Sequence, residues 1–359
     1  MEENAVLFTI KTVPGLEDLL LLECELVAGE CQLLDRRPGR ILVSTEASRI
    51  ARLLETTRLA TSAYAVLARF HLDTTGPSGI DRIYEIALGV EWERHIANGE
   101  TFAVRSERVG RHDFTSIDVS RAVGQAVLDR LGEAGRTARV HLTLPRRIVV
   151  AEVLERELLL GLSLTGDESL HRRWYRVREH TASLKPPIAF AMIVLSGMRD
   201  GELLLDPMCG GGTIPVEALL YLESSRALCN DKSSKSVEMA MENSMTAGVA
   251  CRMEFLNLDV QELPGVLGEE SVDRIITNPP YGIRMGTPRA ALGAVRRLLR
   301  ASRLLLKKRG TLVLITPDRE RVFSEALSQG FAPYCEKWVM HGDLEAWILC
   351  FSKTMPGAL

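Results

Sequence analysis

The chain has 359 residues, of which 46% are hydrophobic and 25% are charged, so it reads as globular throughout and long enough for two or three domains. A net charge of −3 argues against a protein that coats nucleic acid over its whole surface, and the seven cysteines lack zinc-site spacing, which predicts reduced thiols and no metal. The acidic start and the lack of about 20 consecutive apolar residues predict no signal peptide and no membrane span, hence a cytoplasmic protein.

The first 73 residues alternate between strand and helix patterns. We predict strands at 6–13, 31–35, 41–45 and 62–72, and helices at 14–29 and 46–60. This βαββαβ order is the ferredoxin-like arrangement. The stretch "TTGPSG" at 74–79 then marks a break in the chain. Residues 1–73 are therefore expected to form an N-terminal ferredoxin-like domain.

A second α/β pattern follows the break. We predict helices at 80–96 and around Val119 to Val127, and strands at 101–109, 139–144 and 146–164, the last of them bent or broken into a hairpin. Residues 74–165 are therefore expected to form a small domain. Residues 101–150 hold nine arginines, no lysine and five acids, a local charge of +4. Across the whole chain arginines outnumber lysines by 36 to 8, which suits bidentate phosphate contacts, although codon bias or a hot habitat explains this ratio equally well.

Residues 166–182 are polar, basic and aromatic without strong periodicity, so we expect a linker there. From 183 to 359 strand and helix patterns alternate, which is typical of a parallel sheet. The predicted strands are 202–207, 226–231, 252–259, 272–280 and 310–317, and the predicted helices are 213–223, 234–248, 289–307 and 319–330. The closing strands, 331–341 and 345–353, are joined by too few residues for a crossover and must form an antiparallel hairpin. The expected architecture is a doubly wound sheet that ends in one reversed strand.

A glycine-rich turn follows the first strand of this region, in "LLLDPMCGGGT". Glycines between strand and helix let a ligand approach the backbone, but the spacing is neither that of a phosphate-binding loop nor that of a dinucleotide fold. Asp206 at the strand end favours a cofactor that carries positive charge or an amino group. The next two strands also end in acids, Asp231 and Asp259. Any one of the three is as readily a helix cap or loop acid, but together they suit S-adenosylmethionine.

The stretch "TNPPYG" follows a buried strand pattern at 272–277. Pro279 and Pro280 lack backbone N–H groups and hold φ near −65°, so the backbone around Asn278 is rigid and its carbonyls stay free. Such a turn suits an acceptor of amino groups.

The motifs "DPMCGGGT", "ND" at 230–231, "LD" at 258–259 and "NPPYG" resemble those of the class I, Rossmann-like methyltransferases that act on exocyclic or amide nitrogens. The resemblance implies that the side-chain oxygen of Asn278 and a proline carbonyl accept the two hydrogens of the target amine, and that Tyr281 stacks on the flat substrate. Catalysis would then be alignment and electrostatics, without a metal or a covalent intermediate. The same turn serves adenine-N6, cytosine-N4, guanine-N2 and protein-glutamine methylation.

The N-terminal half indicates which substrate applies. The segment "TFAVRSERVGRHDFTSIDVSRAVGQAV" resembles the THUMP domain, an RNA-binding module. With a ferredoxin-like domain before it and "LHRRWYRVREHTASLKPPIAFAMI" after it, the chain is similar to THUMP-containing tRNA guanine-N2-methyltransferases, most closely to those that act on the sixth nucleotide in the acceptor stem. The tenth-nucleotide subgroup tends to carry Asp-Pro-Pro-Tyr, whereas this chain has Asn278. Another RNA or tRNA position, and a non-catalytic RNA-binding protein, remain as alternatives.

The resemblance implies a set of site residues, with tRNA, through its acceptor stem and 3′ end, as the partner. A monomer is expected, although the sequence does not fix the oligomeric state. The catalytic turn comprises Asn278, Pro279, Pro280 and Tyr281. The cofactor-binding residues are Leu184, Lys185, Pro186, Asp206, Pro207, Cys209, Gly210, Gly212, Thr213, Asp231, Asp259 and Asn278.

For RNA binding we favour a group of basic residues, because structured RNA is held largely by phosphate and 2′-hydroxyl contacts. They are Arg105, Arg108, Arg111, His112, Arg121, Arg172, Arg173 and Arg176. The alternative is a solvated charged face, with Trp174 packed between domains, which is what we expect of Trp174. For His112 and His180 we expect structural roles, since the methylated product loses its proton without a base.

Overall fold

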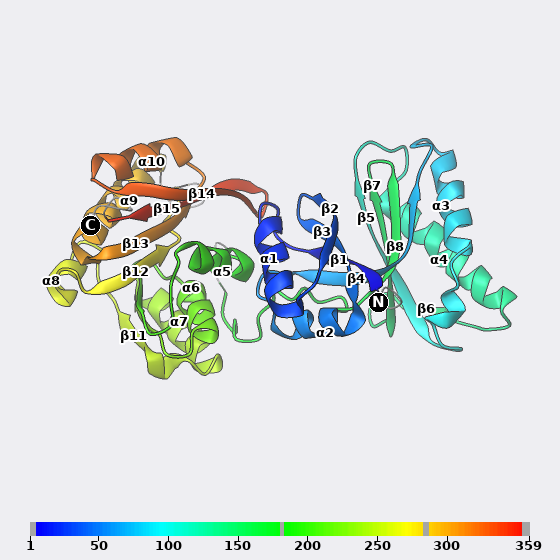
Figure 1. The fold of residues 1–359 in the computed structure, drawn as a ribbon, viewed down its shortest axis with the longest axis horizontal. Coiled ribbons are helices and arrows are strands. Elements are labelled where there is room, and N and C mark those ends of the chain that lie inside the picture. Colours follow the sequence, from blue (N-terminus) through cyan, green and yellow to red (C-terminus); the bar gives the residue numbers. More distant parts are fainter. Residues whose placement is uncertain (1–4, 180–182, 283–286, 354–359) are drawn as a thin grey trace. The chain divides into compact units, whose positions relative to one another are not determined.

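A computed structural model describes residues 5–179, 183–282 and 287–353 of the chain (Figure 1). The protein divides into two compact units. The first comprises Met1–Lys11 and Leu21–Leu170, and the second comprises Thr12–Leu20 and His171–Leu359. Within the described ranges, no helix is both long enough and apolar enough to cross a membrane.

The N-terminal elements follow the predicted βαββαβ order. They are β1 (Ala5–Lys11), α1 (Glu17–Ala28), β2 (Gln32–Arg37), β3 (Arg40–Glu46), α2 (Ala47–Thr56) and β4 (Ser62–His71). The strands pair in the order β2-β3-β1-β4, and every pairing is antiparallel. The ferredoxin-like arrangement predicted from the sequence is therefore confirmed.

The next elements of the first unit are α3 (Ser78–Leu88), a short 3-10 helix (Trp92–Arg94), β5 (Thr101–Val109), α4 (Ser116–Glu133), β6 (Arg139–Val140), β7 (Arg147–Leu154) and β8 (Glu157–Ser163). Their strands continue the first sheet, because β8 pairs antiparallel with β4. One eight-stranded sheet results, in the order β2-β3-β1-β4-β8-β7-β5-β6. Gly161 permits this join, since a Cβ there would lie 2.2 Å from the carbonyl oxygen of Ala65.

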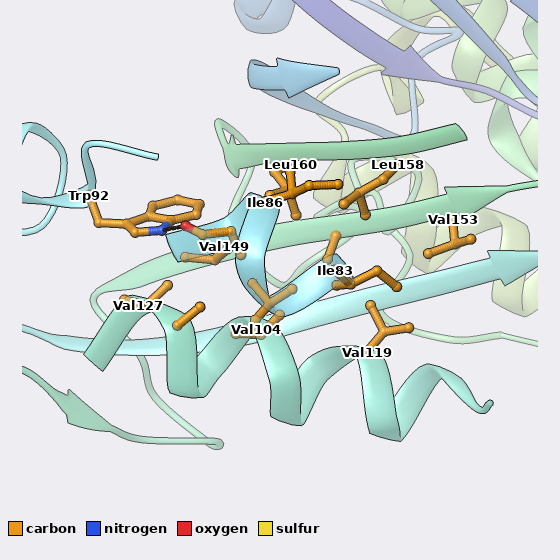
Figure 2. Packing of buried hydrophobic residues seen from close by; sticks show 14 of the residues in the cluster. Ile83, Ile86, Trp92, Val104, Val119, Val127, Val149, Val153, Leu158 and Leu160 are labelled. Carbon is orange, nitrogen blue, oxygen red and sulfur yellow. Dashed lines mark hydrogen bonds between the residues drawn. The ribbon is translucent and has the colours of Figure 1, made fainter. Parts of the chain in front are cut away.

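Helices α3 and α4 pack on the part of this sheet formed by β5, β7 and β8, where Val104, Val149 and Leu160 are buried (Figure 2). The predicted helix over 80–96 is wrong beyond Leu88. The chain turns at Gly89, so that Trp92 enters the core and donates a 2.7 Å hydrogen bond from Nε1 to the carbonyl oxygen of Ala87. This bond satisfies the only donor of a fully buried side chain.

Two other predictions for this unit have different outcomes. The strand expected over 139–144 shrinks to two residues, Arg139–Val140, because the following residues leave the sheet and expose Leu142 and Leu144. The segment 146–164 breaks into a hairpin as predicted, with β7 and β8 paired antiparallel around Glu155, which has a φ of 56°.

The second unit contains β9 (Leu203–Asp206), β10 (Arg226–Asn230), β11 (Met253–Leu256), β12 (Val272–Thr277), β13 (Leu306–Thr316), β14 (Ala332–His341) and β15 (Leu344–Ser352). They form one sheet in the order β11-β10-β9-β12-β13-β15-β14. Strand β15 runs antiparallel to both of its neighbours, whereas the other pairs are parallel. The predicted doubly wound sheet with one reversed strand is confirmed.

The helices of this unit are α5 (Pro186–Leu195), α6 (Thr213–Tyr221), α7 (Ser234–Thr246), α8 (Leu263–Leu267), α9 (Pro288–Leu305) and α10 (Arg319–Ser328), with a 3-10 turn at Ala250–Arg252. Helices α5 and α8 are additions to the predicted set. Helix α5 starts with Pro186 in its first turn and buries eight of its ten residues, so it lacks the amphipathic pattern that reveals surface helices.

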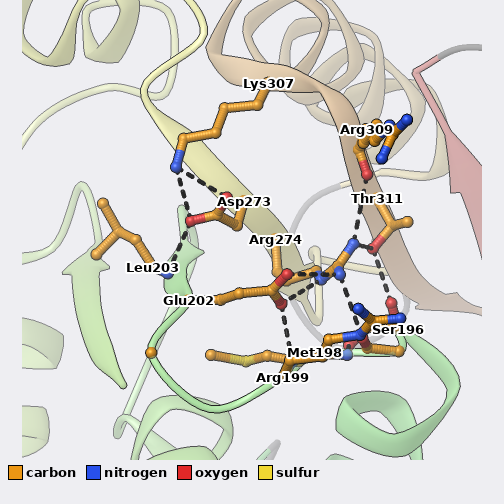
Figure 3. A network of polar contacts seen from close by, with 12 residues as sticks. Ser196, Met198, Arg199, Glu202, Leu203, Asp273, Arg274, Lys307, Arg309 and Thr311 are labelled. Carbon is orange, nitrogen blue, oxygen red and sulfur yellow. Dashed lines mark hydrogen bonds and ion pairs between the residues drawn. The ribbon is translucent and has the colours of Figure 1, made fainter. Parts of the chain in front are cut away.

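Polar contacts hold the amino ends of β9 and β12 (Figure 3). The guanidinium of Arg274 makes two 2.8 Å hydrogen bonds to the carboxylate of Glu202 and a third, of 3.2 Å, to Thr311 Oγ1. Asp273 accepts from Lys307 Nζ at 2.8 Å and from the backbone N–H of Leu203 at 3.0 Å. These contacts fix the strands at the end opposite to the glycine turn.

Candidate active site

In the sheet of the second unit, the carboxyl ends of four strands lie next to one another. Strands β11, β10, β9 and β12 are neighbours and parallel, so their carboxyl ends all lie at the same end of the sheet. Asp206 ends β9, Asp231 follows β10 directly, Asp259 lies three residues after β11, and Asn278 follows β12. The three acids and the catalytic turn predicted from the sequence thus all lie at the carboxyl end of the sheet.

The glycine turn between β9 and α6 is tightly packed at Gly212 and open at Gly210. Gly212 caps α6 with a φ of 76°, and a Cβ there would come within 3.0 Å of the Cβ of Ala240. Gly210 also has a positive φ, of 52°, but a Cβ there would meet no atom of the described residues within 4 Å. Gly212 is therefore required by packing, and Gly210 leaves the space that a ligand approaching the backbone needs.

Asp206 is buried and directly connected to β12. Its Oδ1 accepts a 2.7 Å hydrogen bond from Thr277 Oγ1 and a 3.2 Å bond from the backbone N–H of Met208. Burial raises the pKa of Asp206 to about 7, the two hydrogen bonds lower it, and the charge of Asp231 raises it. A carboxyl group with this pKa gains or loses its charge near neutral pH, and a positively charged ligand favours the ionised form.

Asp231 holds the glycine turn in shape. Its Oδ2 accepts a 3.0 Å hydrogen bond from the backbone N–H of Gly210, and its Oδ1 accepts from that of Ser233 at 2.9 Å. A carboxylate has about four acceptor positions, so capacity remains for ribose hydroxyls. Asp231 thus supports the turn from the end of β10 and keeps acceptor positions for a ligand.

Asp259 is half-buried and lies in the loop after β11. Its Oδ1 accepts from the backbone N–H of Gln261 at 3.1 Å, and this bond lowers the pKa of the carboxyl group, as do the nearby charges of Arg297 and Lys232. The group is therefore ionised at neutral pH and can accept a hydrogen bond from an amino group.

Asn230, which is not among the predicted site residues, connects the turns that follow β9, β10 and β11. Its fully buried amide donates to the carbonyl oxygens of Pro207, at 3.0 Å, and Leu258, at 3.1 Å, and accepts from the N–H of Leu258. Its own carbonyl oxygen accepts from the N–H of Cys209 at 2.8 Å. The signal available was the "ND" pair at the end of β10, in which only the acid was given a role.

The other predicted cofactor-binding residues lie close to the same turn in the sequence or begin neighbouring helices. Lys185 caps α5, Leu184 and Pro186 beside it are buried, and α5 packs on α6 through a perpendicular contact of the Phe190 and Tyr221 rings at 4.9 Å. Pro207 and Thr213, at the two ends of the turn, are buried as well. Burial raises the pKa of the Cys209 thiol, so this residue is a neutral packing group.

The turn Asn278 to Tyr281 presents two unused polar atoms. Asn278 Oδ1 and the hydroxyl oxygen of Tyr281 are both inaccessible to solvent, and neither has a hydrogen-bond partner among the described residues. Buried polar atoms are nearly always satisfied in proteins, so these two are available for hydrogen bonds to a ligand at the turn. Burial raises the pKa of Tyr281, whose hydroxyl therefore stays protonated at neutral pH. Pro279 is buried and Pro280 is exposed.

The predicted RNA-binding residues of the first unit are on or next to β5 and α4. Arg111 is exposed, and Arg121 has 76% of its side chain exposed, with a long 3.5 Å contact to Asp118. Arg105 is paired with Asp167 at 2.6 Å, and Arg108 donates to the carbonyl oxygen of Gly110 at 2.8 Å. His112 Nε2 lies 2.6 Å from the carbonyl oxygen of Glu155, and its Nδ1 lies 3.2 Å from Arg108.

The predicted RNA-binding residues of the second unit divide into exposed and enclosed ones. Arg172 is exposed, but Arg173 has only 12% of its side chain exposed and pairs at 3.0 Å with the buried carboxylate of Glu217. Arg176 has 8% of its side chain exposed. Trp174 is 66% exposed. His180 lies outside the described residues.

A cavity of about 420 Å³ lies in the first unit, bordered by Lys11, Tyr64, Glu107, Glu152 and Asp167. None of the predicted catalytic or cofactor-binding residues borders it. The candidate site lies elsewhere, at the carboxyl ends of β9, β10, β11 and β12, next to Asn278 Oδ1 and the Tyr281 hydroxyl. Within the described part of the chain, no three His, Cys, Asp or Glu side chains are grouped as metal ligands would be.

Two protein families match separate parts of the chain. Residues 77–163 match the THUMP domain family, and residues 173–346 match the RMKL-like methyltransferase domain family. The chain is 34% identical over 377 residues to the tRNA (guanine(6)-N2)-methyltransferase of Archaeoglobus fulgidus, a match that covers 96% of this chain and 92% of the relative. It is 30% identical to the protein of the same name from Methanocaldococcus jannaschii, covering 92% and 96%.

A solved structure also resembles the whole chain. The crystal structure of TrmN from Thermus thermophilus superposes with a TM-score of 0.79 at 31% identity, covering 97% of this chain and 99% of that one. Both the sequence and the fold are therefore shared along nearly the full length.

Proposed function

The chain belongs to the family of THUMP-containing tRNA guanine-N2-methyltransferases, and we propose that it transfers a methyl group from S-adenosylmethionine to the exocyclic N2 of the guanosine at position 6 of tRNA. The observation that carries this proposal is Asn278 Oδ1, a buried acceptor without a partner among the described residues. It lies one residue beyond Thr277, which is hydrogen-bonded to Asp206 at the edge of the glycine turn. An acceptor for the target amine and a turn for the methyl donor are thus adjacent.

The residues of the catalytic turn act on the target amine by orientation. The lone pair of an amino group on a conjugated ring is delocalised, and acceptors at its two hydrogens return electron density to the nitrogen. Asn278 Oδ1 and a carbonyl oxygen of the proline pair would serve as these acceptors, and the ring of Tyr281 would stack on the guanine. A general base is unnecessary because the methylated amine loses its proton readily, and the raised pKa of Tyr281 makes its hydroxyl a poor base.

The strand ends fit the parts of S-adenosylmethionine, which supplies a methyl group on a positively charged sulfur when bound. Asp206 would hold the positively charged end of the cofactor, Asp231 the ribose hydroxyls and Asp259 the adenine amino group. Among the described residues, none would contact a Cβ at Gly210, so the backbone of the turn is accessible to the cofactor. Leu184, Lys185 and Pro186 would close over the methionine end.

Exposed arginine side chains support binding of tRNA. We propose that the protein binds tRNA through the acceptor stem and 3′ end, and that it acts as a monomer in the cytoplasm. Arg111, Arg121 and Arg172 expose their side chains, and Arg105 and Arg108 are partly used by neighbouring groups. Arg173 and Arg176 are enclosed by protein, so we leave them out of the RNA surface.

Unmodified tRNA transcripts incubated with the protein and labelled S-adenosylmethionine test the proposal. We expect N2-methylguanosine at position 6, and no product with Asn278→Ala. A transcript with inosine at position 6, which lacks only the 2-amino group, is the matched control and should remain unmethylated. N6-methyladenosine would overturn the choice of base. N2-methylguanosine at position 10, or methylation of ribosomal or small nuclear RNA alone, would overturn the choice of position.

A further inference from the structure

The ring of Tyr281 lies against a histidine from a distant part of the sequence. The centroids of the Tyr281 and His341 rings are 6.3 Å apart and the ring planes are nearly perpendicular, at 89°. This is the edge-to-face arrangement that aromatic pairs prefer. His341 is the last residue of β14, just before the turn into β15, and it is half-buried. The contact therefore links the catalytic turn to the end of the closing hairpin.

The end of this hairpin is held by residues from near the N-terminus, which belong to the same compact unit. The backbone N–H of Met340 donates a 3.0 Å hydrogen bond to the carbonyl oxygen of Pro14. Gly15 has a φ of 98°, and a Cβ there would lie 2.1 Å from the carbonyl oxygen of Trp338. The segment therefore approaches β14 as closely as a backbone without a side chain allows.

An ion pair also joins the N-terminal segment to β14. Lys337 Nζ lies 2.7 Å from the carboxylate of Asp18, and the lysine side chain is 17% exposed. The backbone contacts of Met340 and Trp338 and this ion pair of Lys337 involve three residues of β14, all within four positions of His341. The position of His341 is thus determined by contacts that lie outside the catalytic turn.

We propose that His341 is a positioning residue that fixes the plane of the Tyr281 ring. The Tyr281 hydroxyl has no hydrogen-bond partner among the described residues, so packing rather than a polar anchor sets the orientation of the ring. If the target guanine stacks on Tyr281, that ring plane decides whether the N2 amino group meets Asn278 Oδ1. The inference rests on the proposed function and adds a residue to its site.

A proton-transfer role for His341 gives a different expectation. Phenylalanine can make the same edge-to-face contact but cannot exchange protons. His341→Phe should therefore stay active if His341 positions the Tyr281 ring, and should lose activity if His341 is a general base. The comparison of His341→Phe with His341→Ala therefore separates the two roles.

Single-turnover methylation of a tRNA transcript tests the proposal. We expect His341→Ala to lower the rate about tenfold, which is what the loss of one aromatic contact predicts, while KM for tRNA and the affinity for S-adenosylmethionine stay unchanged. His341→Phe should remain within about twofold of the unsubstituted protein. Asp343→Ala, on the exposed turn beside His341, is the matched control and should have no effect. If His341→Ala fails to fold, His341→Leu takes its place.

Two results would overturn the proposal. The first is a folded His341→Ala protein with an unchanged rate, and the second is a His341→Phe protein as slow as His341→Ala. Failure of the proposed function is distinguishable from both, because the unsubstituted protein would then not methylate the transcript.

Substitution of Gly15 tests the contribution of the N-terminal segment. Gly15→Ala should also lower the single-turnover rate about tenfold, because it displaces the end of β14. Gly99→Ala is the matched control, since Gly99 has a similar positive φ of 79° and a Cβ there would meet no described atom within 4 Å. A folded Gly15→Ala protein with full activity would remove the segment from the proposal. If Gly15→Ala does not fold, Asp18→Ala, which removes only the Lys337 pair, gives the same comparison.

Discussion

Thr277 Oγ1 donates a 2.7 Å hydrogen bond to Asp206 Oδ1, and both side chains are buried. The two residues end neighbouring parallel strands, β9 and β12. Asp206 begins the glycine turn, and Thr277 immediately precedes Asn278. The bond therefore fixes the distance between the part of the site that would hold the methyl donor and the part that would hold the target amine.

Removal of the Thr277 hydroxyl should weaken cofactor binding. Thr277→Val keeps the shape of the side chain but deprives Asp206 of a hydrogen bond that lowers its pKa, so more of the carboxyl is protonated at pH 7. We expect S-adenosylmethionine to bind about tenfold more weakly by calorimetry. Thr277→Ser, which keeps the hydroxyl, should bind normally. Equal affinities for the valine and serine variants would show that the bond has no role in binding.

The affinity for S-adenosylmethionine should rise with pH. The pKa of Asp206 in the folded protein, about 7, lies above its ordinary value of 3.8, so the carboxyl group gains its charge as the pH rises through 7. A positively charged ligand prefers the ionised form, and the dissociation constant should therefore fall between pH 6 and pH 8. Asp206→Asn should bind weakly at every pH. A flat profile for the unsubstituted protein would contradict this role of Asp206.

Protein stability should change with pH in the opposite direction. A raised folded-state pKa means that the folded protein holds the proton more tightly than the unfolded chain, so the contribution of Asp206 is fully present below about pH 4 and is lost as the pH rises through about 7. The difference in unfolding free energy between the unsubstituted protein and Asp206→Asn, measured in urea at each pH, isolates this contribution. The unsubstituted protein should lose stability relative to the variant over that interval.

Asn230 should be required for the shape of the site. Asn230→Ala removes an amide that joins the turns after β9 and β11, and we expect it to lower the free energy of unfolding by about 3 kcal/mol and to abolish cofactor binding. The exposed Asn257, whose amide donates one 2.8 Å bond to the carbonyl oxygen of Asp231, is the matched control. Asn257→Ala should cost about 1 kcal/mol or less. Chemical denaturation of both variants makes the comparison.

Arg121 and Arg173 should have separable roles. Arg121→Ala should weaken tRNA binding and lower the slope of log affinity against log salt concentration by about one, without a change in stability. Arg173→Ala removes the cation beside the buried carboxylate of Glu217 and should lower the free energy of unfolding by about 3 kcal/mol. Filter binding at several salt concentrations and thermal unfolding measure the two effects. An Arg121→Ala protein with an unchanged salt slope would exclude Arg121 from the RNA surface.

The sequence predicted the elements best where their pattern is local. Strand β5 and the hairpin of β14 and β15 were predicted within a residue or two, because alternating apolar residues and turn signals lie within short windows. Helix α5 was missed because it is buried on nearly all sides and therefore has no amphipathic period. The helix expected to reach residue 96 was overextended, since a propensity pattern does not show that Trp92 turns into the core.

By itself the sequence determined which residue types follow the strands of the second sheet, because the order of strands and turns can be inferred from local patterns. The glycine turn, Asp206, Asp231, Asp259 and Asn278 could all be selected from short motifs and from the order of parallel strands. The tertiary structure decided which side chains are available and which are occupied. It enclosed Arg173, exposed Trp174, and placed His341 beside Tyr281, 60 positions earlier in the chain. Such contacts depend on how distant segments pack, and packing leaves no periodic signal in the residues that make it.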